Sequence, residues 1–373
     1  MATNTQLKKI KLKNLENIVL ISDIHFGIRN ASVEWLENMT GYFNNFFFPL
    51  LNKIKEETPN SIVIIAGDYF DNRQSLDLNV MGTGIDIMES MSEILPVYII
   101  NGNHDVYRKN DNTINSLKVL RPIKNTHVIT DNTVLETEKH KFLLFPWSGD
   151  IKGDFAIVLN LPDDIDYAIM HEDIKSLIYD NGRQIVSGFD SSTFKGKKIY
   201  SGHIHKRQES DKVTYIGSPY QLKRSDIGNT KGIYVLNVKE NDVAEKFYPN
   251  DYSPKFLKLI AKDIVDLPHE NLVQIMSNNY VDIIIKRTEL NTINVSDLMK
   301  QLDECGAKKI EVILDNSEME QILSEESEVS KDLTIEDITK SKINKLDIPD
   351  EEKAKIIKLN EQYIAASNEL IDN

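Results

Sequence analysis

Residues 17–25 read NIVLISDIH, an apolar run that ends on two metal-ligand side chains, Asp23 and His25. Four later segments repeat this design: 61–68 (SIVIIAGD, with Asp68), 95–105 (LPVYIINGNHD, with Asn103 and His104), 166–171 (DYAIMH, with His171) and 197–205 (KKIYSGHIH, with His203 and His205). Each run predicts a buried strand, and in open α/β sheets ligands bind at the carboxyl ends of strands. We call these segments blocks one to five.

The chain around the blocks alternates strand-like runs with helix-like stretches, which predicts a layered α/β sandwich. Helices are expected over 33–56, with an interruption near Pro49, and over 76–94. Further strands are expected at 142–145, 155–158, 167–170, 198–201, 213–216 and 232–238.

The turn-rich segment 247–254, FYPNDYSP, predicts a domain boundary. A small α/β unit should follow, with strands near 256–260, 280–286 and 308–314 and helices near 267–276 and 295–304. An acidic linker is expected at 316–331, followed by two helices, about 334–346 and 350–371. We therefore expect a first domain at 1–248, a second at 249–315, the linker, and a helical region at 332–373.

Charge is uneven along the chain. Residues 1–250 hold 32 acidic and 29 basic residues, whereas residues 251–373 hold 26 acidic and 15 basic, within a net charge of −14. A strongly basic nucleic-acid footprint is therefore absent, although local basic side chains can still contact phosphates. No apolar run reaches the length of a membrane span, no signal peptide is recognisable, and Cys305 is the only cysteine. We expect a cytoplasmic protein without a membrane partner.

The ligand types in the blocks predict a pair of divalent metals, since hard oxygens with imidazoles suit such ions and a thiolate site is excluded. A consistent division puts Asp23, His25, Asp68 and His205 on one metal and Asp68, Asn103, His171 and His203 on the other. Asp68 would bridge the two ions with its two oxygens. Two metals about 3.5–4 Å apart can activate water and stabilise an in-line phosphoryl displacement.

Two further polar residues are predicted to take part in the chemistry. His104 adjoins Asn103 and could protonate the leaving oxygen or stabilise phosphate charge. Asp71, three residues beyond Asp68, could accept a hydrogen bond from His104 and set its tautomer. A single DxH or HxH is more often structural, but five blocks in one order are hard to explain that way. His127, His140 and His269 lack such surroundings and are read as structural or surface residues.

The order DxH, GDxxD, GNHD, H and GHxH over residues 18–220 resembles the calcineurin-like metallophosphoesterases. FPW at 145–147, YIGSPYQ at 215–221 and the small α/β unit with terminal helices resemble the nuclease subunit of SbcCD-type repair complexes, including those of T-even-like bacteriophages. Asp71 departs from archaeal and eukaryotic relatives, which tend to have histidine there.

The resemblance implies two manganese ions, with magnesium possible, and single-strand endonuclease and duplex exonuclease activity on DNA in break repair and recombination. It also implies an SbcC-type coiled-coil ATPase partner bound by the terminal helices, a capping role for the small unit, and a homodimer within a heterotetramer. We expect several basic residues near the blocks to contact DNA phosphates: Arg29, Arg73, Arg108, Lys109, Lys206 and Arg207. The alternatives are a phosphomonoesterase or cyclic-nucleotide phosphodiesterase with the same metals, or a non-catalytic scaffold.

Overall fold

The computed structural model describes residues 7–108, 111–210, 212–290, 292–315, 343–344, 349 and 352–357. By contacts the chain divides into two units, residues 1–283 with 295–312, and residues 284–294 with 313–373. The acidic linker and most of both predicted terminal helices lie outside the described residues, and the four-part domain division stays a prediction. No helix in the described part of the chain is both long enough and apolar enough to cross a bilayer.

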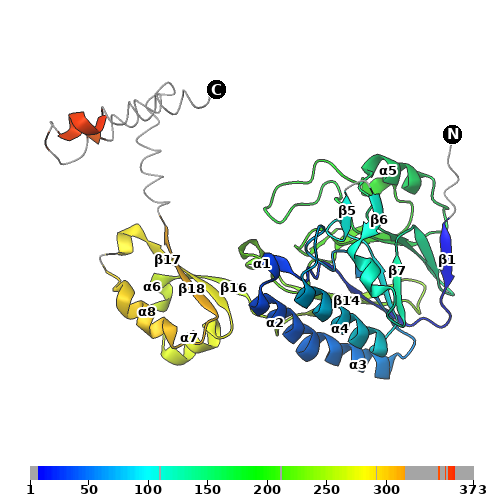
Figure 1. Cartoon of the computed structure of the whole chain (residues 1–373), viewed down its shortest axis with the longest axis horizontal. Coiled ribbons are helices and arrows are strands. Elements are labelled where there is room, and N and C mark those ends of the chain that lie inside the picture. Colours follow the sequence, from blue (N-terminus) through cyan, green and yellow to red (C-terminus); the bar gives the residue numbers. More distant parts are fainter. Residues whose placement is uncertain are drawn as a thin grey trace. The chain divides into compact units, whose positions relative to one another are not determined.

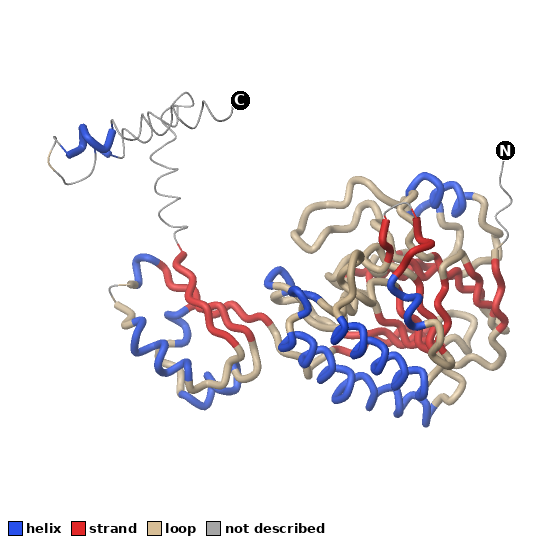
Figure 2. The backbone as a smooth tube through the Cα atoms, in the orientation of Figure 1, coloured by secondary structure: helices blue, strands red, loops and turns tan. Residues whose placement is uncertain are grey.

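Two mixed sheets form the centre of the first unit (Figures 1 and 2). The six-stranded sheet has the order β15 (Ala244–Pro249), β14 (Gly232–Asn237), β2 (Asn17–Ile21), β3 (Ile62–Ala66), β4 (Val97–Ile100) and β7 (Thr126–Ile129). The seven-stranded sheet has the order β1 (Lys8–Lys11), β8 (Thr133–Glu136), β9 (Lys141–Phe145), β10 (Tyr167–Met170), β11 (Lys198–Ser201), β13 (Val213–Tyr215) and β12 (Gln208–Glu209). A separate hairpin pairs β5 (Val106–Arg108) with β6 (Asp111–Asn115).

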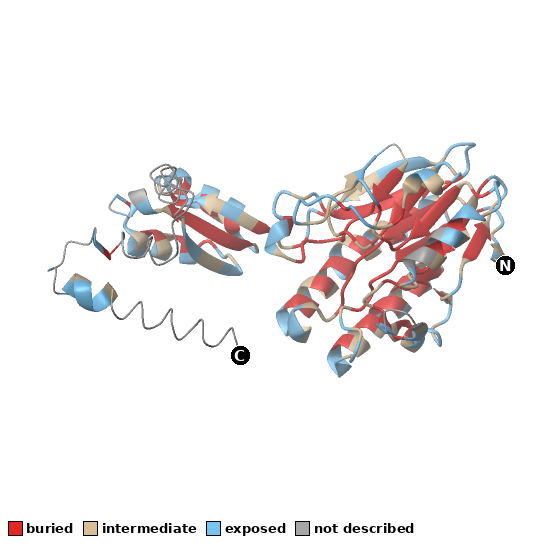
Figure 3. Ribbon diagram, turned by 90° about the horizontal axis from the view of Figure 1, so that it is seen from above, coloured by how far each residue is buried: buried red, intermediate tan, exposed pale blue. Residues whose placement is uncertain are grey.

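Strand periodicity explains the layers, because alternate residues of a strand face opposite sides of the sheet. Val19 and Val63 pack with the helices, whereas their neighbours Leu20 and Ile64 pack between the two sheets. The seven-stranded sheet has a third cluster on its other face, which includes Met170. Strands that are buried on both faces have unbroken apolar sequences, and these are the runs from which the strands were predicted. Figure 3 shows this burial as red strands between helices whose outer faces are exposed.

Helices cover the outer face of the six-stranded sheet (Figure 1). The helical elements before residue 249 are α1 (Ile28–Ala31), α2 (Val33–Tyr42), the π-helical turn η1 (Phe43–Phe47), α3 (Phe48–Glu57), α4 (Leu78–Ile94), α5 (Ile151–Leu159), and the 3-10 turns η2 (Ser116–Leu120), η3 (Ser191–Thr193) and η4 (Arg224–Asp226). The predicted strand at 155–158 is wrong, since these residues belong to α5. Asp150 caps that helix by accepting the Gly153 N–H at 3.0 Å, so a capping signal was present.

The expected interruption near Pro49 is wrong in position, because Pro49 lies in the first turn of α3. The irregularity precedes it, where the Phe48 N–H donates to Phe43 O across the wider π turn. Such a turn rearranges the hydrogen bonds just before a proline, which has no N–H to donate. The chain therefore stays helical from α2 to α3.

The elements beyond residue 249 match the expected small α/β pattern. They are β16 (Phe256–Ile260), α6 (Ala261–Ile264), α7 (His269–Met276), β17 (Tyr280–Lys286), the 3-10 turn η5 (Arg287–Glu289), α8 (Val295–Asp303) and β18 (Lys309–Asp315). The strands form one sheet in the order β16, β17, β18. The central strand is buried over its first six residues, which fits its apolar sequence YVDIII.

Candidate metal centre

In all five blocks the predicted ligands come just after a strand, as expected. Blocks one to three leave the neighbouring strands β2, β3 and β4 of the six-stranded sheet, and blocks four and five leave the neighbouring strands β10 and β11 of the seven-stranded sheet. The sheets converge here, because the His203 N–H donates to Asp23 Oδ1 at 3.0 Å. The predicted ligands of both sheets thus surround one small volume.

The ligands are held by tight loops rather than by the strands themselves. Asp23, His25, Asp68 and His203 have φ of 55°, 56°, 53° and 83°, in the left-handed region that non-glycine residues rarely occupy. Asp23 and His25, like His203 and His205, therefore do not alternate along an extended strand, since β2 ends at Ile21 and β11 at Ser201. Backbone strain of this kind concentrates at functional sites.

One set of ligand atoms gathers around His25. Its Nε2 lies 3.0 Å from Nε2 of His205 and 3.5 Å from Asp68 Oδ2. Asp23, His25 and His205 can each offer a ligand atom within 4.8 Å of the others. The sequence analysis assigned these three residues, together with Asp68, to one metal.

A second set gathers around Asn103. Its Oδ1 lies 3.1 Å from Nε2 of His171 and 2.7 Å from Nδ1 of His203. His171 Nε2 is also 3.2 Å from Asp68 Oδ2. Asp68, His171 and His203 can offer ligand atoms within 4.8 Å of one another. Because Asp68 Oδ2 also lies 3.5 Å from His25 Nε2, Asp68 connects this set with the one around His25.

The electrostatics of this volume favour a cation. Asp23 and Asp68 are buried, and Asp23 Oδ2 has no hydrogen-bond partner among the described residues. Burial alone would lower the pKa of His171, but the carboxylates of Asp68 and Asp23 raise it to about 10. Burial and the neighbouring His25 hold the pKa of His205 well below its usual value, which keeps that imidazole neutral and able to bind a metal. Oxygen and imidazole donors around buried negative charge therefore fit a divalent metal.

Hydrogen bonds on the far ring nitrogens orient two of the histidines. His171 Nδ1 lies 2.7 Å from Ala66 O, and His25 Nδ1 lies 3.0 Å from Asp71 Oδ1. In both residues Nε2 therefore faces the other predicted ligands. A hydrogen bond on the opposite ring nitrogen is the usual way in which a protein orients a metal-binding imidazole.

The expected contact between His104 and Asp71 forms through the backbone oxygen of Asp71 rather than through its carboxylate. Its carboxylate contacts His25, while Nδ1 of His104 lies 2.5 Å from the backbone oxygen of Asp71 and 4.0 Å from its Oδ1. The tautomer of His104 is thus set by the peptide group of Asp71. His104 also belongs to a candidate ligand group with His25 and Asp68.

Asp105 is a supporting residue that the sequence reasoning did not single out, although it ends GNHD. Its buried carboxylate accepts the N–H groups of Asp68 and Gly102, both at 2.8 Å, and of Tyr69 and Phe70, both at 3.2 Å. It therefore ties block two to block three.

The two secondary markers also support block backbones. Tyr220, in YIGSPYQ, donates its hydroxyl to the carbonyl of Ile24 at 2.8 Å, between Asp23 and His25. The Trp147 N–H, in FPW, donates to Asn101 O at 3.0 Å, two residues before Asn103. These motifs hold the loops that carry ligands.

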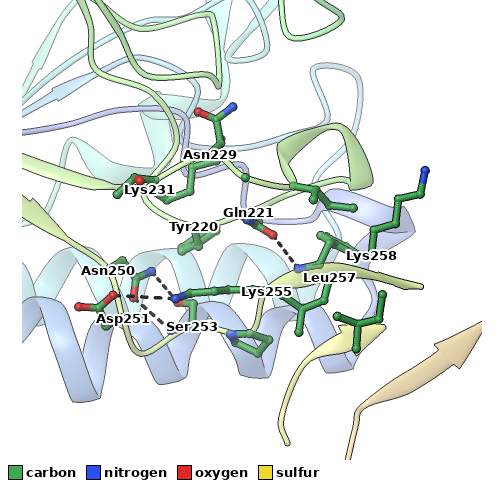
Figure 4. A pocket seen from close by; sticks show the side chains of 16 residues that line it. Tyr220, Gln221, Asn229, Lys231, Asn250, Asp251, Ser253, Lys255, Leu257 and Lys258 are labelled. Atoms are coloured by element: carbon green, nitrogen blue, oxygen red, sulfur yellow. Dashed lines mark hydrogen bonds and ion pairs between the residues drawn. The ribbon is translucent and has the colours of Figure 1, made fainter. Parts of the chain in front are cut away.

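Lys231 is a buried cation next to block five. Its Nζ donates to His205 O at 2.6 Å and to Asp226 Oδ1 at 2.8 Å. Lys231 also lines the cavity of about 380 Å³ in Figure 4, formed by residues 220–221, 227–231, 250–251 and 253–259. None of the predicted metal ligands lines this cavity.

The residues expected to contact DNA differ in how they are engaged. Arg29 stacks on Trp35, 4.5 Å from the ring centre, and Arg207 donates to Glu209 at 2.6 Å. Arg108 is exposed, and Arg73 and Lys206 are half-buried. Lys109 lies outside the described residues. The contacts of all six residues with DNA stay predictions.

His127 stacks on Tyr98 and His140 bonds Glu240 O at 2.7 Å, as expected for structural histidines.

The chain is similar to a known protein family and to several known proteins. The family model of calcineurin-like phosphoesterases matches residues 16–207. Exonuclease subunit 1 of Enterobacteria phage T4 is 23% identical over 239 residues, which are 63% of this chain and 68% of that protein. A protein of Invertebrate iridescent virus 6 provisionally named phosphoesterase 244L is 21% identical over 277 residues, 72% of this chain and 88% of its own length. The crystal structure of the calcineurin-like phosphoesterase YfkN from Bacillus subtilis aligns with a TM-score of 0.34 and 13% identity, over 63% of this chain and 90% of that one.

Proposed function

The chain belongs to the calcineurin-like phosphoesterase family, and from that premise we propose that it is a two-metal DNA nuclease. The observation that supports two metal positions is the pair of ligand sets around His25 and Asn103, with Asp68 Oδ2 lying 3.5 Å from His25 Nε2 and 3.2 Å from His171 Nε2. DNA as the substrate is supported by the name of the phage relative, an exonuclease subunit, and by the motifs at 145–147 and 215–221. Manganese is the metal we propose, with magnesium as the substitute.

The protein groups divide the work of phosphodiester hydrolysis. Asp23, His25, Asp68 and His205 would hold one ion, and Asp68, Asn103, His171 and His203 the other. When bound, such ions activate water and neutralise charge on the phosphate. The left-handed loops and the carboxylate of Asp105 fix these ligands in place before substrate arrives, so little reorganisation is needed.

His104 is the group we propose for the leaving oxygen. With Nδ1 held by Asp71 O at 2.5 Å, its Nε2 is the nitrogen left to exchange a proton. His104→Ala should keep both metals and lose about 10²–10⁴-fold in cleavage rate, the range for general acid–base catalysis. Loss of metal from this variant would instead make His104 a ligand, which its place beside His25 and Asp68 allows.

The test of substrate class is a side-by-side assay with manganese. Labelled single-stranded DNA, duplex DNA and p-nitrophenyl phosphate are offered to the wild type and to Asp68→Asn. We expect cleavage of both DNAs by the wild type and of neither by the variant. Activity on the small ester alone would contradict the nuclease assignment and favour a phosphomonoesterase.

A partner ATPase is a separate proposal that rests on the resemblance and on the terminal segment. Residues 350–371 have isoleucines at 357, 364 and 371, a heptad-spaced apolar stripe suited to another helix. A chain truncated after residue 330 should retain manganese nuclease activity and fail to co-purify with the ATPase. Intact co-purification would contradict this proposal. The homodimer of the heterotetramer belongs to the same proposal.

A further inference from the structure

The segment 172–190, here called the excursion, leaves block four and returns before β11. Its Ile174 bridges to Phe189, and both side chains pack in the apolar cluster on the outer face of the seven-stranded sheet. The excursion contains none of the five blocks and no predicted ligand. It nevertheless brings two carboxylates to block five.

The first carboxylate faces His203. Asp173 Oδ1 lies 3.3 Å from Nε2 of His203, and its other oxygen accepts the Tyr179 hydroxyl at 3.2 Å. Oδ1 is shielded from solvent and has no hydrogen-bond partner among the described residues. The opposite nitrogen of His203, Nδ1, is the one that meets Asn103. The ring therefore lies between a metal-ligand set and Asp173.

The second carboxylate supports His205. Asp180 Oδ1 accepts the N–H of Lys206, the residue after His205, at 3.0 Å. Asp180 Oδ2 is held by Lys223 Nζ at 2.7 Å and lies 3.7 Å from Nδ1 of His205. That last distance is too long for a hydrogen bond, so Asp180 acts on the backbone beside His205 and places a negative charge beside its ring. Nε2 of His205 is the nitrogen that meets His25.

We propose that Asp173 and Asp180 are positioning residues that act on the two metal positions separately. This inference rests on the two-metal centre of the proposed function. Asp173 would hold His203 for the position shared with Asn103 and His171, and Asp180 would hold His205 for the position shared with Asp23 and His25. A carboxylate beside the far nitrogen of a ligating imidazole fixes ring orientation and raises ligand basicity. The excursion thereby sets the affinity of both positions for metal without supplying a ligand.

The experiment measures manganese binding to the full-length protein by calorimetry and electron paramagnetic resonance, without DNA. Asp173→Asn and Asp180→Asn should each weaken one manganese position about 10–100-fold and leave the other unchanged. Asp190→Asn is the matched control, because this excursion residue only caps the turn at Ser192 and should bind manganese as the wild type does. Thermal unfolding of the metal-free variants verifies that each one folds.

Double variants assign the positions. Asp180→Asn added to His205→Ala should cost nothing further in manganese affinity, whereas Asp173→Asn added to His205→Ala should weaken the remaining position. Unchanged affinities in both single variants, or weakening of the same position by both, would overturn the inference. A wild type that binds two manganese ions and cleaves no DNA would contradict the nuclease proposal and leave this inference standing.

Discussion

The two sheets support their ligands in different ways. Blocks one to three, on the six-stranded sheet, are tied to one another, since Asp105 of block three binds four N–H groups from Asp68, Tyr69, Phe70 and Gly102. Blocks four and five, on the seven-stranded sheet, are separated by the excursion and are held by side chains from outside the blocks. The first half therefore has a block residue, Asp105, at the centre of its loop hydrogen bonds, whereas the second half also uses two carboxylates of the excursion, Asp173 and Asp180.

The largest effect is expected where the first half is locked. Asp105→Ala leaves four buried N–H groups without their acceptor. A buried N–H group left without an acceptor costs about 1–3 kcal/mol, so we expect the free energy of unfolding to fall by at least about 3 kcal/mol. Urea unfolding of the metal-free protein measures it. Asp190→Ala, from the other half, should change stability little, and an equal loss in the two variants would remove the contrast between the halves.

A smaller effect is expected where the halves meet, at Gly67. This residue has φ +88°, and a Cβ there would overlap Nδ1 of His171 from block four. Gly67→Ala should lower both stability and manganese affinity. Gly228→Ala is the matched control, since Gly228 has φ +77° with open space around it and should show only the left-handed backbone cost of about 1–2 kcal/mol. Equal losses in the two variants would mean that the contact with His171 does not matter.

A pH dependence links the two halves through Asp68 and His171. Burial opposes protonation of His171, but the carboxylate of Asp68 outweighs it and raises the pKa to about 10, compared with about 6.5 in an unfolded chain. The folded state therefore holds a proton that the unfolded state loses. This stabilisation of the metal-free protein is complete below about pH 6.5 and is lost as pH rises toward 10.

Manganese competes with that proton, so its affinity should rise over the same pH interval. Unfolding and manganese titrations at a series of pH values measure both trends. Asp68→Asn should flatten the stability trend, because it removes the largest source of the raised pKa. A wild type with pH-independent stability between pH 6.5 and 10 would contradict this coupling.

The sequence predicted the strands well for a physical reason. Strands buried on both faces must be apolar throughout, so runs such as IVIIA end visibly at the first metal-ligand residue. The conformation of the ligand loops could not be predicted, because DIH and HIH also fit an extended strand. Only the fold shows that Asp23 and His25 have left-handed backbones.

The supporting residues were hidden for another reason. Asp173, Asp180 and Lys231 are ordinary charged residues with no spacing signal, and the partners that they contact in or next to block five lie between 26 and 30 positions away in sequence. The partner of Asp71 was likewise not readable, since the choice between His25 and His104 depends on how two loops pack. The apolar run at 155–158 is too short to distinguish strand from helix by period alone.

The central claim is that ligands from two sheets form one centre with two metal positions. The most direct test is the number of manganese ions bound by the full-length protein after stripping with chelator, measured by calorimetry and elemental analysis. We expect two ions per chain in the wild type, one in His205→Ala and one in His203→Ala, and none retained tightly in Asp68→Ala. A single ion in the wild type, or two in Asp68→Ala, would contradict the account.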